Sequence, residues 1–503
     1  MKNIVDQVFE CPEAWQDHVL YTSREGQATY AGTRGAMLRV ASWLTRQHGV
    51  QAGETVAICL PVSIAAVHII LGILAAGASY LPLEFNGPME RLAKILGDSG
   101  ARILLTTEAM AGKFANRADV TERPAIVTIE PDLSAFSSIV SSFTPLTRPV
   151  STSPGGIAVT FFTSGSTGEP KGVMMSYASM ADQCGIYAGN IPLRKDDRHI
   201  MLAPLHYAAS LGIFCALGVG GRTYLATAQE AMFAEVVGEI LERERITFLE
   251  AASTRLRLLA EDRSLLARDL SAVRFIMFYG EPMPIDTLRA VSGLFPRAQL
   301  QNTYAASEAF WIMRYLVPRP IPEELEKLPI GKLREDYTLF LRGPDGKQVA
   351  PGEVGEICVV GPVGLAGYWN RPDLTAEARL DGIPNSYRTG DLARLGSDGN
   401  YYFAGRRDHQ VKIRGHRFEL GEIEAVIKSH HLVREAVAFL VAEEVHACVL
   451  AQDRNGLAGE IRTVCARRLP VFARPARIIV MEKFPQLPSG KVDRMALQKA
   501  NSG

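Results

Sequence analysis

A regular alternation of short apolar runs with longer amphipathic runs, through about the first three hundred residues, constrains the fold more than any other feature. Strand-like apolar runs occupy residues 55–60, 101–106, 246–250 and 273–278. Helical patterns occupy residues 233–243 and 253–261, between such runs. This repetition of strand, helix and strand favours layers of α and β structure with substantially parallel sheets.

One apolar stretch, residues 62–83, is long enough to suggest a membrane span. However, His68 lies within it, Gly77 suits the end of a helix, and residues 80–83 have the composition of a strand. We therefore expect a buried helix followed by a buried strand.

The pattern changes from about residue 333, where shorter strands are separated by turn signals. Asp398, Gly399 and Asn400 precede an aromatic run and predict a hairpin turn that enters a strand. A charged stretch at residues 406–409 is the predicted linker to a small C-terminal domain.

These patterns predict an α/β fold with two domains. The large N-terminal domain, made of layered sheets and helices, is expected to comprise residues 1–407, with a β-rich subdomain at about residues 333–407. A small α+β domain is expected to comprise residues 408–503.

Charge and cysteine content argue against several classes of function. The 503 residues include 54 Lys and Arg and 54 Asp and Glu, whereas a dedicated nucleic-acid binder needs clustered positive charge. The seven cysteines are scattered, so neighbours cannot form a metal knuckle or a redox pair. The chain starts with polar and acidic residues, unlike a secretory signal. We expect a reduced, cytoplasmic protein that binds neither nucleic acid nor a membrane.

The most informative segment is an apolar strand, residues 157–162, that runs into a loop rich in hydroxyl groups and glycine, residues 163–172. The N–H groups and hydroxyls of such a loop can surround phosphate oxygens, and Lys171 adds a positive charge. The segment is not a Walker loop, because Pro170 stands where the second glycine belongs. A surface linker is the alternative interpretation.

Several motifs in a fixed order resemble those of one family. The loop at residues 163–172 resembles the signature loop of the AMP-forming adenylating superfamily, which includes acyl-CoA synthetases, peptide-synthetase adenylation domains and luciferases. Other segments resemble its Tyr-Gly-x-Thr-Glu, Thr-Gly-Asp, hinge and C-terminal lysine motifs, at residues 302–308, 387–391, 405–424 and 487–491. Residues 78–83 and 90–92 resemble a core segment of peptide-synthetase adenylation domains. The resemblance covers nearly the whole chain and is strongest to a freestanding adenylation enzyme.

This resemblance implies a ligase with two half-reactions. A carboxylate attacks the α-phosphorus of ATP to give an acyl-AMP and pyrophosphate, and the acyl group then passes to a thiol. Because an anion approaches a polyanionic nucleotide, the first step requires cations. ATP and Mg²⁺ are therefore the implied cofactors.

The resemblance also implies roles for individual residues around the nucleotide. Glu308 would help hold Mg²⁺, Tyr304 would stack on adenine, and Asp391 would accept hydrogen bonds from the ribose. The implied nucleotide-binding residues are Thr163, Ser164, Gly165, Ser166, Thr167, Gly168, Lys171, Asn302, Tyr304, Ser307, Asp391 and Arg406. Ala305 departs from the family pattern, in which a glycine follows the tyrosine.

Lys491 is the implied catalytic residue of adenylation, because a long ammonium side chain can bind oxygens of both the carboxylate and the α-phosphate. In the family, the small domain then swings about a hinge, which matches Asp408 here. That motion presents the stretch from Lys412 to Gly415, with Lys412 as a further catalytic candidate, to a phosphopantetheine arm. Gly415 would let the thin arm pass close to the backbone.

The substrate is expected to lack an α-amino group. Members that activate amino acids pair the ammonium with an Asp, but the alignment places Tyr207 at that position, and a buried ammonium without a carboxylate is costly. An aryl or fatty acid is therefore expected, with His206 resembling the gate histidine of acyl- and aryl-acid ligases. The implied pocket walls are Tyr207, Ser210, Leu211, Ala251, Ala252, Phe278, Gly280, Asn302 and Ala306.

The expected acceptor is a separate acyl or peptidyl carrier protein, in the biosynthesis of a natural product. Free CoA is the first alternative, and an amino-acid adenylation enzyme, including one for β-amino acids, is the second. A protein that keeps the fold without the chemistry is a third, but the retained charged residues argue against it.

Overall fold

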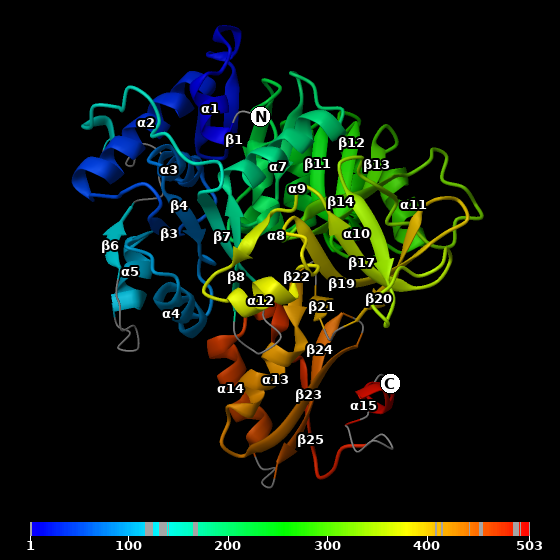
Figure 1. The fold of residues 1–503 in the computed structure, drawn as a ribbon. Helices are drawn as coiled ribbons and strands as arrows, with labels where there is room; N and C mark the ends of the chain where they lie inside the picture. The colour runs from blue at the N-terminus through cyan, green and yellow to red at the C-terminus, as the bar shows by residue number, and fades with distance from the viewer. Residues whose placement is uncertain are drawn as a thin grey trace.

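The computed structural model describes residues 3–115, 124–129, 138, 140–163, 170–407, 410–413, 416–441, 443–451, 456–485, 492 and 494–501. Its described part contains two large mixed sheets, an antiparallel sheet and a smaller C-terminal sheet, all with helices packed around them (Figure 1). The predicted α/β fold, with a large N-terminal part and a small C-terminal part, is confirmed.

One large sheet has nine strands in the order β15-β14-β13-β12-β11-β9-β10-β1-β2, and the central strands from β13 to β1 are parallel. Its strands are β1 (Val19–Ser23), β2 (Gly26–Thr29), β9 (Arg198–Met201), β10 (Arg222–Leu225), β11 (Phe248–Ala252), β12 (Phe275–Tyr279), β13 (Gln299–Ala306), β14 (Phe310–Leu316) and β15 (Lys332–Leu333). The predicted strands at residues 246–250 and 273–278 are β11 and β12, each of which begins two residues later than expected.

The other large sheet has seven strands in the order β18-β8-β7-β4-β3-β5-β6, and the strands from β7 to β6 are parallel. Its strands are β3 (Thr55–Cys59), β4 (Ser79–Pro82), β5 (Ile103–Thr106), β6 (Ala125–Thr128), β7 (Ile157–Thr163), β8 (Lys171–Ser176) and β18 (Leu365–Tyr368). The predicted loop thus follows β7, and of its residues Thr163 and 170–172 are described.

Helices cover both large sheets. They are α1 (Ile4–Phe9), α2 (Tyr30–Gln47), α3 (Ile64–Ala75), α4 (Met89–Asp98), α5 (Glu108–Ala115), α7 (Tyr177–Asn190), α8 (Ala228–Met232), α9 (Ala234–Arg243), α10 (Ser253–Glu261), α11 (Ile285–Leu294) and α12 (Pro372–Glu377), with short 3₁₀ turns η1 (Glu13–Trp15), η2 (Ala208–Phe214) and η3 (Arg263–Ala267). The largest core cluster joins α3 to Tyr80 and Phe161 of one sheet and to Phe248 and Phe275 of the other.

The apolar stretch at residues 62–83 forms α3 and β4, as predicted, and every residue of α3 is buried. Ser63 caps the helix by accepting the N–H of Ala66 at 3.1 Å, and Gly77 follows it with a φ of 78°. A side chain at Gly72 would meet Val40 of α2 at 2.2 Å, so glycine permits the close contact between α2 and α3. No helix in the described ranges combines the length and apolar character needed to cross a membrane.

Residues 338–406 contain a four-stranded antiparallel sheet, in agreement with the change of pattern near residue 333. Its strands are β16 (Thr338–Arg342), β17 (Gly355–Val360), β19 (Ser386–Leu395) and β20 (Tyr401–Arg406). The predicted hairpin turn at residues 398–400 connects β19 to β20.

The C-terminal residues form a separate unit with its own core, drawn in orange and red in Figure 1. It contains the hairpin β21 (Gln410–Ile413) and β22 (His416–Glu419), the sheet β23 (Val433–Val441), β24 (Glu444–Ala451) and β25 (Arg477–Met481), the helices α13 (Leu420–Lys428), α14 (Leu457–Arg468) and α15 (Arg494–Ala500), and the 3₁₀ turn η4 (Val471–Ala473). Asp408, the predicted hinge, lies outside the described residues, and the domain boundary stays a prediction.

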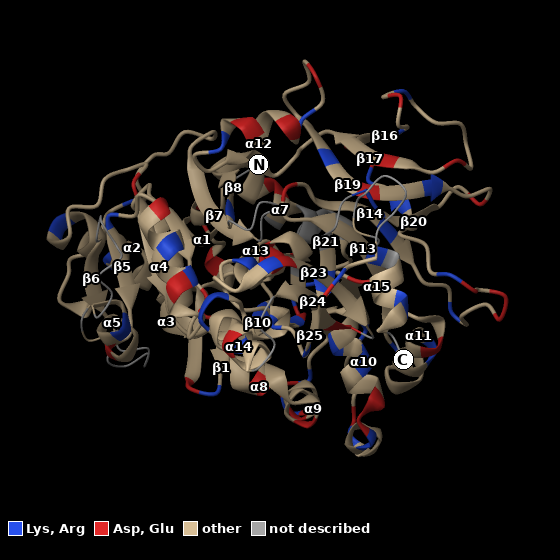
Figure 2. Ribbon diagram, turned by 90° about the horizontal axis from the view of Figure 1, so that it is seen from below, with Lys and Arg blue, Asp and Glu red and all other residues tan. Residues whose placement is uncertain are grey.

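Charged side chains of both signs are interspersed over the ribbon in Figure 2, as expected from their equal numbers in the sequence. Positive charge relevant to a nucleotide must therefore be sought in a local site rather than in the net charge.

Candidate active site

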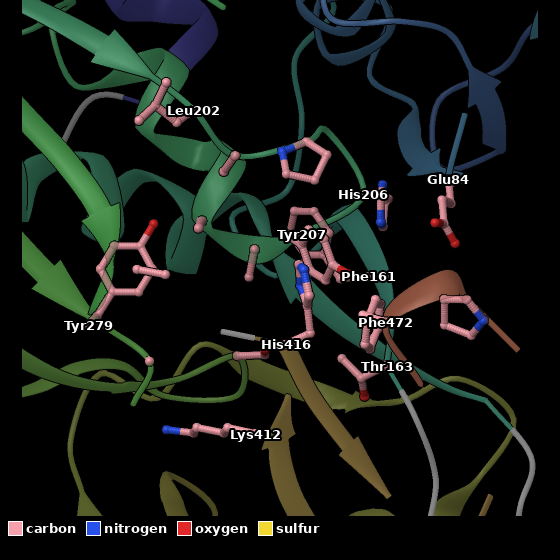
Figure 3. A pocket seen from close by; sticks show the side chains of 18 of the residues that line it. Glu84, Phe161, Thr163, Leu202, His206, Tyr207, Tyr279, Lys412, His416 and Phe472 are labelled. Carbon is pink, nitrogen blue, oxygen red and sulfur yellow. The ribbon is translucent and has the colours of Figure 1, made fainter. Parts of the chain in front are cut away.

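A cavity of about 650 Å³ lies where the two large sheets, the antiparallel sheet and the C-terminal unit meet. Its lining includes Phe161 and Thr163 from β7, Tyr279 from β12 and Phe472 from η4 (Figure 3). Arg406 from β20 also belongs to the lining. The volume is in the range of sites for small molecules. Because the lining comes from both parts of the chain, the cavity depends on their relative position.

Twelve residues that the sequence singled out line this cavity. They are Thr163, His206, Tyr207, Leu211, Ala251, Ala252, Gly280, Ala306, Ser307, Asp391, Arg406 and Lys412. The predicted phosphate-loop residues Ser164, Gly165, Ser166, Thr167 and Gly168, together with Asp408, Gly415 and Lys491, lie outside the described residues. The roles of all these residues remain proposals.

The other predicted residues lie behind the lining. The Ser210 hydroxyl donates to the carbonyl of Leu205 at 3.0 Å, and the side-chain amide of Asn302 donates to the carbonyl of Pro329 at 2.7 Å. Phe278 is fully buried in the core on one face of its sheet. Its neighbour Tyr279 lines the cavity instead, because successive side chains of a strand point to opposite faces.

Asp391 on β19 is the centre of a hydrogen-bonded network that also includes side chains from β20 and β13. Its carboxylate accepts a hydrogen bond of 2.6 Å from the Tyr304 hydroxyl and pairs with the Arg406 guanidinium, which lies opposite it across β19 and β20. Its backbone N–H donates to the hydroxyl of Thr389 at 3.0 Å. The Asp391 and Arg406 side chains are 6% and 11% exposed, so the pair is held in a defined position at the cavity wall.

The Tyr304 ring is buried in the core, where burial raises the pKa of its phenol. The phenol is therefore a neutral donor to Asp391 at physiological pH.

Glu308 and Lys171, which are distant in sequence, both contact Tyr368. The Tyr368 hydroxyl donates to the fully buried Glu308 carboxylate at 2.8 Å, and the Lys171 ammonium lies 5.3 Å from the centre of the Tyr368 ring. β18, which carries Tyr368, pairs with β8, which begins at Lys171. This pairing brings the end of the predicted phosphate loop close to the predicted magnesium ligand.

Four aromatic rings form a row along one wall of the cavity (Figure 3). The His206 ring is 4.3 Å from Tyr207, Tyr207 is stacked on His416 at 4.6 Å, and His416 is 4.3 Å from Phe472. The first two rings come from the segment before η2 and the last two from the C-terminal unit. The row is therefore assembled only when the two parts of the chain are in contact.

The imidazoles of His206 and His416 are neutral at physiological pH because both are buried. Burial lowers the pKa of His206 to about 3, with a smaller effect from His416, and lowers that of His416 to about 4. Burial also raises the pKa of the Tyr207 phenol. The wall thus carries no formal charge at neutral pH.

Several lining residues were not selected from the sequence, including Glu84, Arg91, Glu250, His416 and Phe472. Glu250 stands next to Ala251, so the strand that supplied a predicted wall also contains this carboxylate. No local sequence pattern indicated His416 and Phe472, because only the contact between the two parts of the chain brings them into the cavity.

Two family models match the chain, one over most of the N-terminal part and one in the C-terminal unit. The sequence model of the family described as AMP-binding enzyme matches residues 8–369, and that of the AMP-binding enzyme C-terminal domain matches residues 422–491. The chain belongs to the AMP-binding enzyme family. This confirms the predicted superfamily, and the protein is accordingly an adenylating ligase that uses ATP.

Two curated proteins have similar sequences. An L-proline–[L-prolyl-carrier protein] ligase of Pseudomonas fluorescens is 30% identical over 461 residues, which cover 90% of this chain and 91% of the relative. Tyrocidine synthase 1 of Brevibacillus parabrevis is 30% identical over 98% of this chain, but the chain spans only 44% of that protein.

One solved structure is also similar to this protein. The amide bond synthetase McbA from Marinactinospora thermotolerans has a TM-score of 0.88 at 24% sequence identity, over 99% of this chain and 100% of that protein. At this level of identity, the similarity shows the shared fold.

Proposed function

We propose that the protein activates a carboxylic acid without an α-amino group to an acyl-AMP, with release of pyrophosphate, and passes the acyl group to the phosphopantetheine thiol of a separate carrier protein. The position of Tyr207 is the main observation in favour of this class of acid. Its neutral ring lines the cavity between His206 and His416, where the resemblance places an aspartate in amino-acid-activating relatives.

The walls near Tyr207 support this choice. Small and apolar side chains form much of the lining, including Leu202, Ala226, Ala231, Ala251 and Ala252. An α-ammonium held beside neutral aromatic rings would lose its hydration without gaining a counter-ion, which is costly. An aryl or aliphatic acyl chain is better matched to such walls.

Asp391 and Arg406 support the proposed ATP site, because both line the cavity and each is fixed by the other. A ribose hydroxyl can donate to Asp391, and a guanidinium such as that of Arg406 is suited to bind nucleotide oxygens. No cluster of three or more His, Cys, Asp or Glu suited to a metal occurs within the described ranges. Glu308 is nevertheless compatible with Mg²⁺, which is commonly held by one or two carboxylates and the substrate phosphates.

Two observations support the proposed thiol acceptor: the position of Lys412 and the similarity to a ligase that acts with a carrier protein. Lys412, on the C-terminal hairpin, lines the same cavity as Tyr207 and Asp391. The C-terminal unit therefore reaches the site where an acyl-adenylate would lie. The L-prolyl-carrier protein ligase, which matches over most of both chains, supports a carrier protein over free CoA.

Pyrophosphate exchange with a panel of acids tests the first half-reaction. We expect ATP-dependent exchange with aryl or aliphatic acids and little with the proteinogenic α-amino acids. Exchange with α-amino acids alone would show that the Tyr207 argument is wrong. Acyl transfer to a phosphopantetheinylated carrier protein, measured beside transfer to CoA, tests the acceptor.

Adenylation of an α-amino acid is the second candidate, because the proline-activating relative is 30% identical over nearly the whole chain. In that case Tyr207→Ala should change which α-amino acid is accepted. Under the main proposal, α-amino acids remain poor substrates of both forms.

A further inference from the structure

The cavity opens to solvent between the helices α8 and α10 on one side and the turn η4 of the C-terminal unit on the other. The described lining residues are mostly buried or partly buried, and those that are exposed are Ala228, Met232, Leu258 and Val471. Met232 ends α8, Leu258 lies on α10 and Val471 begins η4, and their exposed fractions are 63%, 41% and 72%. We call this rim the mouth of the cavity, because a molecule in solvent can enter there.

Arg255 on α10 places a positive charge at this mouth. It belongs to the lining of the cavity, and Nη1 of its guanidinium donates a hydrogen bond of 3.3 Å to the carbonyl of Met232. Arg255 also lies near the C-terminal hairpin, because burial and, to a smaller extent, the charge of Arg255 lower the pKa of His416. His416 in turn stacks on Tyr207. Arg255 therefore lies beside the path from the mouth to the inner part of the cavity.

Arg255 has no carboxylate partner among the described residues. Burial lowers the pKa of its guanidinium, and no acidic group opposes that effect. Arg91 and Arg406 also line the cavity, but each of them pairs with a carboxylate. A partly buried cation without a counter-ion has lost some of its hydration and has gained no ionic interaction in return. Arg255 is therefore suited to bind an anion that enters the mouth.

The acyl acceptor of the proposed function contains such an anion. A phosphopantetheine arm has a thiol at one end and a phosphate at the other, both on a carrier protein and in CoA. During transfer the thiol loses its proton, its sulfur bonds to the acyl carbon, and AMP leaves with the electrons of the broken C–O bond. The thiol must therefore reach the acyl-adenylate inside the cavity, while the phosphate stays toward solvent. An arm that enters through the mouth would place its phosphate near Arg255.

We propose that Arg255 binds the phosphate of the phosphopantetheine arm and holds the arm in the mouth while its thiol reaches the acyl group. This inference rests on the proposed function and adds a binding residue for its acceptor. A guanidinium is matched to a phosphate, because its planar fork of N–H groups can donate two parallel hydrogen bonds. The apolar side chains of Met232, Leu258 and Val471 at the mouth can pack against the uncharged part of the arm.

Acyl transfer to free pantetheine and to free phosphopantetheine tests the proposal, because these thiols differ only in the phosphate. The acid is one that the protein activates in pyrophosphate exchange. We expect kcat/KM for phosphopantetheine to exceed that for pantetheine by about tenfold or more. Arg255→Met should reduce this ratio to less than about threefold by lowering kcat/KM for phosphopantetheine. It should change transfer to pantetheine, and pyrophosphate exchange, by less than about threefold.

Two further measurements identify the interaction. Arg255→Lys should retain part of the preference for phosphopantetheine, because it keeps the charge and loses the fork of donors. Added salt should reduce the preference in the original protein, because charges near solvent are screened. Transfer to CoA and to a phosphopantetheinylated carrier protein should also fall in Arg255→Met, and the acceptor with the larger loss is the source of the phosphate.

Arg257→Met is the matched control. Arg257 is on the same helix, but it pairs with Glu443 at 2.6 Å and lies outside the described lining of the cavity. Its substitution should preserve the preference for phosphopantetheine. Loss of the preference in both variants would overturn the proposal, because the cause would then be the total charge of α10 or its contact with the C-terminal unit. Retained pyrophosphate exchange shows that each variant is folded.

The remaining outcomes separate the inference from the function on which it rests. Equal kcat/KM for the two thiols, or a preference for phosphopantetheine that survives Arg255→Met, would overturn the role of Arg255 while leaving acyl transfer in place. A selective loss of pyrophosphate exchange with hexanedioic acid, relative to hexanoic acid, in Arg255→Met would assign Arg255 to a second carboxylate of the acid and overturn the proposal. Transfer to none of these thiols would overturn the proposed acceptor as well.

Discussion

The Tyr304 hydroxyl donates a 2.6 Å hydrogen bond to Asp391, across 87 positions of the sequence. Arg406 pairs with the other oxygen of the same carboxylate. The proposed ribose acceptor is therefore oriented from two sides, by a buried phenol and by a guanidinium on the neighbouring strand. We therefore predict that Tyr304 and Arg406, which orient Asp391, affect the binding of ATP.

Tyr304→Phe should raise the KM for ATP in pyrophosphate exchange by about 10-fold or more, because a hydrogen bond to a charged group contributes about 1.5–3 kcal/mol. Tyr337→Phe is the matched control. Tyr337 is a buried tyrosine of the same core cluster whose hydroxyl donates to the carbonyl of Ala309 at 2.7 Å. It should lower stability without raising the KM for ATP. Equal effects of both substitutions on that KM would contradict the orienting role.

The Arg91–Glu422 ion pair should stabilise the contact between the two parts of the chain. It joins α4 to α13, and its side chains are 10% and 2% exposed. Arg91→Met should reduce the free energy of unfolding of the C-terminal unit by about 3 kcal/mol, because the buried Glu422 carboxylate loses the guanidinium of Arg91. Hydrogen exchange in α13, followed during denaturant unfolding, measures this loss.

Two comparisons test the cause of that loss. Replacing both Arg91 and Glu422 by Met should recover much of the stability, because no buried charge is then left uncompensated. Arg257 and Glu443 also form an ion pair, at 2.6 Å, but their side chains are 35% and 44% exposed. Arg257→Met should therefore cost at most about 1 kcal/mol.

His416 should contribute to a loss of stability in mild acid. Its pKa is about 4 in the folded protein, against an ordinary value of 6.5, so the unfolded chain binds more protons between these values. Stability is therefore complete above about pH 6.5 and falls as the pH decreases toward 4. Between pH 7 and pH 5, the contribution of this one residue is about 2 kcal/mol.

His416→Phe keeps an aromatic ring beside Tyr207 and removes the titration. The variant should lose about 2 kcal/mol less than the original protein between pH 7 and pH 5, as measured by denaturant unfolding at each pH. His206 and His199 should still contribute, since burial lowers the pKa of each to about 3. An unchanged pH dependence in His416→Phe would contradict the neutral state of this ring.

Lys491→Ala should reduce the adenylation rate by about 10²- to 10³-fold, as expected for the loss of a charge that stabilises developing oxyanions. Transfer from a supplied acyl-adenylate to the thiol should survive. Lys412→Ala provides the reciprocal test, because Lys412 lines the cavity in the present arrangement of the chain, and it should impair transfer more than adenylation. Equal loss of both half-reactions in both variants would contradict the proposed division of roles.

Local pattern was sufficient to predict much of the fold. Residues 62–83 form the helix α3 and the strand β4 because Ser63 and Gly77 mark the ends of the helix and a continuous apolar run favours burial. The strand β7 before the predicted phosphate loop, and the hairpin from β19 to β20, likewise follow from alternation and turn residues close in sequence. Strand ends were less predictable, because β11 begins where pairing with β12 starts rather than where the apolar run begins.

The sequence by itself identified the candidate side chains for adenylation, because the order of the motifs can be recognised without knowledge of any contact. Tertiary structure decided how they are held: Tyr304 against Asp391, Lys171 and Glu308 around Tyr368, and Tyr207 against His416. It also placed Glu250 in the lining of the cavity, because of the face of β11 to which this side chain points. These relationships join segments far apart in the chain, and such contacts depend on sheet pairing and on the packing of the two parts, which a local pattern does not encode.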